Sequence, residues 1–209
     1  MRLTLLLSLV MVITFIVPLF VYDDINVYYE TFGFSAASLG EKPWIPITSI
    51  FLHGNLEHLL SNLFILIFFG LAVEKDLGWR KMLLIFMLGA FAGDFVAIPV
   101  HGFASISIGA SAGIFALIGV GMLVRPVDVS FYPFIIPVPL ALLGLLYAIF
   151  NAYGFFVGPE NISYIAHFGG LFVGLMFGVK EKGMKKSLKI LLISLAILVI
   201  LPLILILLF

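Results

Sequence analysis

The chain has 209 residues, of which 63% are hydrophobic and 11% are charged, and its formal net charge is zero. A soluble domain is about half apolar and about a quarter charged, so this composition indicates an all-α polytopic membrane protein with little mass left for a soluble domain. The zero net charge gives no reason to expect a nucleic-acid partner. The sequence has no cysteine, which excludes disulfides, thiolate metal sites and a cysteine nucleophile.

Apolar runs of about 20 residues are long enough to cross a bilayer as helices. The sequence predicts seven such runs, near residues 3–21, 56–73, 81–100, 110–124, 132–153, 162–179 and 187–208. The first is similar to a signal peptide, but it continues to about Phe20 with no small-residue cleavage site, so we interpret it as a retained helix. Residues 22–55 form one long connection, which is polar, aromatic and too interrupted by Gly and Pro to span.

Positive charge is distributed unevenly over the predicted loops. If the N-terminus is inside, all of the 11 Lys and Arg residues except Lys42 fall on the inner side. These inner residues are Arg2, Lys75, Arg80, Lys81, Arg125, Lys180, Lys182, Lys185, Lys186 and Lys189. Because Lys and Arg accumulate in cytoplasmic loops, the sequence predicts a cytoplasmic N-terminus, an external C-terminus and a place in the plasma membrane.

Polar side chains from three predicted helices share one depth. The fourth helix runs from Ser111 to an inner boundary at Arg125, or about 21 Å at 1.5 Å per residue, whereas the hydrocarbon core is about 30 Å thick. The fourth helix therefore begins, at Ser111, roughly 9 Å below the outer surface. The same count places His167, Asn62 and His58 in this outer layer. Ionisable residues are costly inside a membrane and mark functional sites.

A serine and a histidine at one depth suit nucleophilic catalysis. Serine is a weak nucleophile unless a base accepts its proton, and His167 is the base at the right depth. The sixth helix offers no carboxylate, so we expect a Ser–His dyad with Phe115, one turn after the serine, stacked on the imidazole. An oxyanion needs donors, which the Ser111 N–H, Asn62 and His58 supply. Small residues let the helices approach; they are Gly109, Gly113, Ala166, Gly170, Gly174 and Gly178.

In order and spacing, four pieces of the sequence resemble the rhomboid family of intramembrane serine proteases. They are Phe51-Leu52-His53-Gly54, His58-x-x-x-Asn62 with Gly70 and Glu74, Gly109-x-Ser111, and Ala166-His167-x-x-Gly170-x-x-x-Gly174. The resemblance implies Ser111 as nucleophile, His167 as base, and His58, Asn62 and the Ser111 amide at the oxyanion, with Gly109, Phe115, Gly170 and Gly174 in support.

The same resemblance implies an architecture and a substrate class. We expect one transmembrane domain over residues 1–209, with a rhomboid-like six-helix core over about 1–180 and an extra C-terminal helix at about 187–208. The expected activity is hydrolysis of peptide bonds in or near the transmembrane segments of single-span membrane proteins, with no cofactor and no metal. The oligomeric state is left open. Two departures are Ala112, where many members have Gly, and Phe115, where many have Tyr; neither removes a catalytic group.

Other interpretations stay open at this point. A non-catalytic rhomboid-like protein and a small transporter or channel share the helices, although the sequence shows no inverted repeat. A zinc protease lacks its His-Glu-x-x-His motif, and an aspartyl protease has only faint support in Asp23 and Asp94. Asp94 itself is a structural carboxylate, part of a water path or a partner of His167. His53 and His101 are loop or cap residues, or ligands of a metal.

Overall fold

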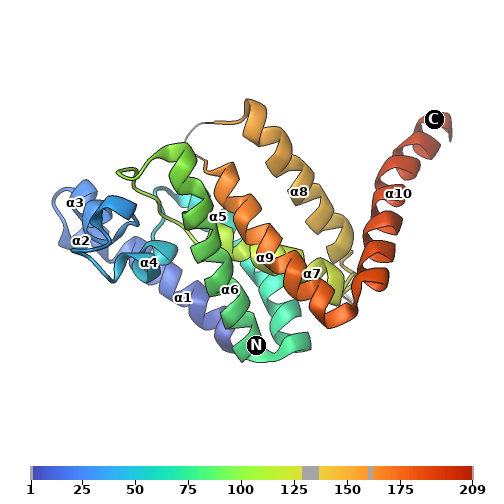
Figure 1. Ribbon diagram of the computed structural model, residues 1–209, viewed down its shortest axis with the longest axis horizontal. Helices are drawn as coiled ribbons and strands as arrows, with labels where there is room; N and C mark the ends of the chain where they lie inside the picture. The colour runs from blue at the N-terminus through green and yellow to red at the C-terminus, as the bar shows by residue number, and fades with distance from the viewer. Residues whose placement is uncertain (1, 129–136, 160–161, 209) are drawn as a thin grey trace.

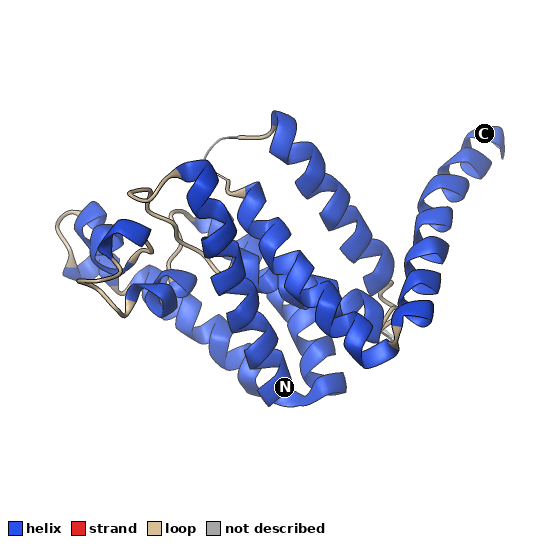
Figure 2. Cartoon of the chain, in the orientation of Figure 1, coloured by secondary structure: helices blue, strands red, loops and turns tan. Residues whose placement is uncertain are grey.

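The computed structural model describes residues 2–128, 137–159 and 162–208, and within them the chain is a bundle of helices (Figures 1 and 2). The main helices are α1 (Arg2–Ile16), α5 (Leu56–Ile65), α6 (Leu71–His101), α7 (Ser111–Val124), α8 (Leu140–Val157), α9 (Tyr164–Lys182) and α10 (Met184–Leu208). A π-helical turn, η3 (Leu66–Gly70), joins α5 to α6. Figure 1 shows α10 at the edge of the bundle, beside α8.

Four helical stretches among the described residues are long and apolar enough to cross a membrane: 2–21, 56–101, 140–157 and 184–207. The second is 46 residues long and is broken at Gly78, whose φ of 79° is left-handed, so it consists of two helices, long enough together for two crossings. With the shorter α7 and with α9, each of the seven predicted segments has a helix. The fold therefore confirms an all-α, multi-pass membrane protein.

The predicted fifth span, 132–153, has the wrong boundaries. The helix begins at Leu140 and ends at Val157; residues 132–136 lie outside the described residues. Pro137 and Pro139 have no backbone N–H to donate, and proline disfavours a helical conformation in the residue before it. Val138 instead exchanges backbone hydrogen bonds with Asp128.

The long connection between the first two spans folds into short helical pieces. They are α2 (Pro18–Val21), α3 (Ile25–Phe32), η1 (Ala36–Ser38), α4 (Ile45–Thr48) and η2 (Ser49–Phe51). Its backbone holds the loop that follows α6, because Phe34 exchanges two hydrogen bonds with Ser107, and Ser49 accepts one from the Gly109 N–H. The connection thus fixes the chain just before Ser111.

Helix α7 lies at the centre of the bundle, and each residue from Ala112 to Val124 is buried. A helix that is apolar on every side must be surrounded by other helices, and here α6, α8 and α9 surround it. The α9 glycines allow the closest approach. A Cβ added at Gly170 would lie 1.9 Å from the Ala112 carbonyl oxygen, and one at Gly174 would lie 2.0 Å from that of Ala116.

Alanine at Gly170 should destabilise the bundle because backbone, unlike a side chain, cannot move aside locally. We expect a loss of about 1–3 kcal/mol, measured as a lower Tm in detergent. Gly178→Ala is the matched control on the same stripe, since its Cβ would meet the flexible side chain of Leu123 at 2.7 Å. Equal Tm values for the two variants would contradict this packing.

Charged residues gather at one end of the bundle. The Glu74 carboxylate accepts hydrogen bonds from the backbone N–H groups of Leu3 and Thr4, which a helix N-terminus otherwise leaves unpaired. Lys81 pairs with Glu181 at 2.7 Å. Arg125 pairs with Asp76 and Asp128. The loops that the charge distribution assigns to one side of the membrane therefore meet in space.

Candidate active site

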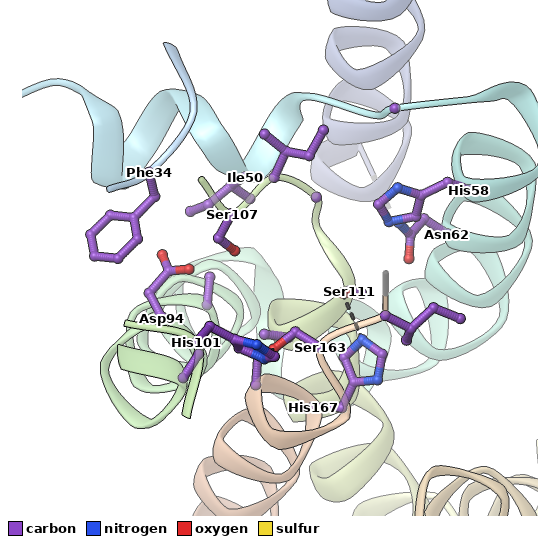
Figure 3. Close-up of a pocket in the computed structure, with 18 of the residues that line it drawn as sticks. Phe34, Ile50, His58, Asn62, Asp94, His101, Ser107, Ser111, Ser163 and His167 are labelled. Atoms are coloured by element: carbon purple, nitrogen blue, oxygen red, sulfur yellow. Dashed lines mark hydrogen bonds between the residues drawn. The ribbon is translucent and has the colours of Figure 1, made fainter. Parts of the chain in front are cut away.

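A cavity of about 750 Å³ opens beside the N-terminus of α7. Figure 3 shows its walls: α5 on one side, α6 on the other, the loop that carries Ser107 above, and α9 below. Each of the predicted residues Ser111, His167, His58 and Asn62 lines this cavity. The tertiary fold thus brings together three helices that are far apart in the sequence.

Ser111 is the first residue of α7, and the loop before it makes a tight approach to α5. Gly109 has φ of 120°, and a Cβ there would lie 2.7 Å from Cε1 of His58. Only glycine fits both the left-handed backbone and the space. Gly109 therefore lets the Ser111 turn lie directly against the His58 ring.

His167 faces the serine from α9. Its Nε2 atom lies 2.8 Å from Ser111 Oγ, as the dashed line in Figure 3 marks. The Phe115 ring is stacked on the imidazole, with centroids 4.4 Å apart and planes 9° apart. This contact has the geometry of a nucleophile beside its base, and Phe115 contributes a ring without a hydroxyl group.

The other imidazole nitrogen has a partner that the sequence reasoning missed. His167 Nδ1 lies 2.8 Å from Oδ1 of Asn151, a residue of α8, and Asn151 Nδ2 donates to the Tyr164 carbonyl oxygen at 3.0 Å. Phe115 is therefore not the only side chain that holds the ring, contrary to our expectation. The sequence does contain an indication of this role, because Asn151 is an amide in an otherwise apolar span, and a polar residue in such a span is costly and marks a functional site.

Two donors face the cavity from α5. Asn62 and His58 lie one turn apart, so they share a face of the helix, and Figure 3 shows both beside Ser111. Asn62 is buried, and its Nδ2 atom has no hydrogen-bond partner among the described residues. A buried amide donor with no partner is costly, so this group is available to donate to an acceptor that enters the cavity.

Asp94 occupies another wall of the cavity. Asp94 belongs to α6. Its carboxylate faces Ser107 (Figure 3) and does not contact His167. Because Asn151 takes the Nδ1 position, the interpretation of Asp94 as a partner of His167 is wrong. His101 Nε2 lies 3.0 Å from Ser163 Oγ at the mouth. In the described residues, no three His, Cys, Asp or Glu side chains come together as a metal site.

His53 lies in the loop before α5, and the fold keeps it neutral. It is 1% exposed, its ring is 4.9 Å from that of His58, and its Nε2 has no partner among the described residues. Burial, aided by the nearby His58, lowers the pKa of His53 to about 4. A charged imidazole here would lose its hydration with an acceptor for Nδ1 alone, the Phe51 carbonyl oxygen at 3.1 Å, and none for Nε2 among the described residues.

Because of His53, the free energy of unfolding should decrease as the pH is lowered. Between pH 6.5 and about 4 the unfolded chain binds a proton that the folded protein does not, so stability is complete above pH 6.5 and decreases below it. The expected loss is about 3 kcal/mol. Thermal unfolding of wild type and His53→Gln from pH 7 to pH 4 measures it; parallel curves for the two proteins would contradict it.

The fold and the cavity define a class of protein, a helical membrane protein with a serine and a histidine in contact inside a cavity between its helices. The model of the Rhomboid domain family matches residues 40–182. The chain belongs to the rhomboid family, which includes serine intramembrane proteases. The matched segment contains each residue of the candidate site.

Several relatives carry the family name. The chain is 30% identical to RHOMBOID-like protein 4 of Arabidopsis thaliana over 140 residues, which are 66% of this chain and 34% of that protein. It is 30% identical to the mitochondrial RHOMBOID-like protein 6 of the same plant, over 66% of this chain and 44% of that protein. It is 36% identical to Rhomboid-like protease 2 of Toxoplasma gondii over 77 residues, 37% of this chain and 27% of that protein. The matches thus span less than half the length of these relatives.

Proposed function

We propose that the protein is a serine endopeptidase that hydrolyses peptide bonds in or near the transmembrane segments of other, single-span membrane proteins. The observation that carries this proposal is the 2.8 Å contact between Ser111 Oγ and His167 Nε2, inside a cavity large enough for a peptide segment. Family membership and the relatives that are named as proteases support it.

The proposed reaction gives each group of the site a role. His167 Nε2 accepts the Ser111 hydroxyl proton while Oγ attacks the scissile carbonyl carbon. Asn62, His58 and the Ser111 N–H donate to the oxyanion that forms. The C–N bond then breaks, and His167 returns the proton to the leaving amine. Water, activated by the same histidine, hydrolyses the acyl-enzyme and releases the carboxylic acid.

A substrate reaches the cavity from the side in this proposal. A shallow hollow between α5 and α8 is lined by Leu56, Leu60 and Phe64, which face outward. It shares Glu57, Ser61, Ile65 and Tyr147 with the cavity. A transmembrane segment lying in this hollow would therefore have its backbone next to the cavity that contains Ser111.

The experiment that tests the function uses purified protein in detergent and two matched transmembrane substrates. A scissile bond must be extended, because a helix hides its carbonyl groups in intrahelical hydrogen bonds. We expect cleavage of a substrate with Gly and Pro near its outer end, protection when leucine replaces them, and labelling of Ser111 by a fluorophosphonate. A protein that neither cleaves nor takes the label is a non-catalytic relative or a transporter, and the proposal fails.

We also propose that the charged end of the bundle faces the cytoplasm of a cell whose plasma membrane holds the protein. The distribution of Lys and Arg supports this orientation. Because the chain has no cysteine, a single cysteine at Lys42 or at Lys182 reports its own side. An impermeant maleimide on intact cells should label only the first; labelling of the second would reverse the orientation.

A further inference from the structure

We propose that Asn151 is a positioning residue that sets the tautomer and the orientation of His167, so that the site works as a Ser111–His167–Asn151 triad. The inference deepens the proposed protease function and depends on it for its kinetic consequences. Asn151 comes from α8, whereas the serine comes from α7 and the histidine from α9. The third member therefore belongs to a helix that contributes no other residue to the proposed reaction.

The direction of each hydrogen bond follows from a backbone carbonyl group, which can only accept. The Tyr164 carbonyl oxygen only accepts, so the Asn151 atom 3.0 Å from it must be the Nδ2 donor. The other amide atom, Oδ1, then faces His167 Nδ1 at 2.8 Å. An amide oxygen only accepts, so Nδ1 carries the ring proton.

The other ring nitrogen, Nε2, is then unprotonated, as a base that accepts the serine proton must be. A neutral imidazole carries one proton, and since Nδ1 holds it, Nε2 presents a lone pair to Ser111 Oγ at 2.8 Å. The hydroxyl must then be the donor. The chain of hydrogen bonds from Tyr164 O through Asn151 and His167 to Ser111 therefore specifies the reactive tautomer without any charged group.

Phe115 cannot do this alone. Its ring is stacked on the imidazole with planes 9° apart, so it restrains the tilt of His167. Stacking is indifferent to a 180° flip of the imidazole about its Cβ–Cγ bond and to which nitrogen has the proton. Such a flip would exchange Nδ1 with Cδ2 and Nε2 with Cε1 with the stacking contact intact. Asn151 supplies the directional contact that distinguishes the two nitrogens.

An amide suits this position better than a carboxylate. Asn151 is 4% exposed and lies in a transmembrane span, where an ionised side chain costs several kcal/mol. The amide orients the imidazole without that cost, although it stabilises the imidazolium less than a negative charge would. This difference gives the asparagine a measurable signature in the pH dependence of the reaction.

The contact also makes the chemistry depend on the position of α8. Gly154, one turn after Asn151, leaves room for the Tyr164 ring, since a Cβ there would lie 2.3 Å from it. The outer part of α8 is thus seated against the start of α9. If a substrate displaces α8 as it enters from the hollow between α5 and α8, His167 loses its orienting partner until α8 returns.

The kinetic test compares Asn151→Ala and Asn151→Asp with wild type. We expect the alanine variant to lose roughly 10- to 100-fold in kcat with KM within about twofold, because its histidine is free to take the wrong tautomer. The aspartate variant keeps an acceptor opposite Nδ1. Its negative charge should stabilise the imidazolium and shift the acidic limb of the kcat/KM profile to higher pH.

Thr14→Val is the matched control for a merely structural role. Thr14 Oγ1 donates to the Phe51 carbonyl oxygen at 2.7 Å, and neither residue lines the cavity. This variant also loses a bond between a side chain and the backbone of another element. We expect it to lower Tm without moving the pH profile. If Asn151→Ala behaves in the same way, or if Asn151→Asp leaves the acidic limb unchanged, Asn151 only joins α8 to α9.

A spectroscopic test does not require activity. Nitrogen-15 NMR of histidine-labelled protein distinguishes protonated from unprotonated ring nitrogens, and His167→Gln assigns the signal among the four histidines. We expect the Nδ1–H tautomer in wild type and a mixture in Asn151→Ala. An Nε2–H tautomer in wild type would overturn the inference even in an active enzyme. The expected tautomer in a protein that cleaves nothing would uphold the geometry and reject the protease function.

Discussion

Ser111→Ala and His167→Ala should each abolish cleavage, with kcat lower by at least about 10⁴-fold, in variants that still unfold cooperatively on heating. The two residues act as one unit, because the serine is unreactive without its base and the base has no proton to accept without the serine. The double variant should therefore be no worse than either single one. Cleavage assays and fluorophosphonate labelling of the three purified variants measure this.

A second serine and a second histidine of the cavity provide an internal control for this prediction. Ser163 and His101 form a second contact of the same kind, with Oγ and Nε2 3.0 Å apart. Their contact lies at the mouth, and His101 is exposed. Ser163→Ala should retain most of its cleavage activity and all of its labelling. Loss of labelling in Ser163→Ala but not in Ser111→Ala would move the nucleophile to the mouth of the cavity.

Loss of the Asn62 amide should slow the chemistry without weakening binding. Its buried Nδ2 has no partner among the described residues, so it is free to donate to an oxyanion that exists only during reaction. Removal of one such donor typically costs about 10²–10³ in rate. Because the Ser111 N–H survives any side-chain change, we expect Asn62→Ala to lower kcat by roughly ten- to a hundredfold and to leave KM nearly unchanged.

Two variants separate the donor from the shape of the side chain. Asn62→Asp keeps the size but cannot donate when ionised, so it should be at least as slow as Asn62→Ala. His58→Ala should lose rate and also stability, because the ring packs against His53 and Gly109. If Asn62→Ala lowers Tm while kcat at a permissive temperature stays within about twofold of wild type, Asn62 only ties α5 to the loop before Ser111.

Much of the architecture could be predicted because it depends on local chemistry. Each of the seven predicted spans corresponds to a helix, since a lipid-exposed backbone must satisfy its own hydrogen bonds and only a helix does so within one segment. The boundary of α8 was wrong, because Pro137 and Pro139 are apolar enough to extend the run but cannot form a helical turn there. Hydropathy measures solvent preference and does not record which backbone donors are missing.

The candidate site, like the fold, could be predicted from the sequence only in part. Depth along a helix axis can be counted from the sequence, so the sequence predicts one layer for Ser111, His167, His58 and Asn62. Asn151 and Asp94 show what that count lacks. Both are polar residues in predicted spans, yet one contacts His167 and the other faces Ser107.

By itself, the sequence determined the class of fold and the small residues that let α9 approach α7, and it predicts one depth for the polar residues. Only the tertiary structure decided that the third partner of the serine and histidine is an asparagine from α8. The physical reason is that a residue's direction around its helix axis matters only relative to a neighbouring helix. The identity and rotation of that neighbour are set by close packing, such as Gly170 against the Ala112 carbonyl, and not by the local sequence.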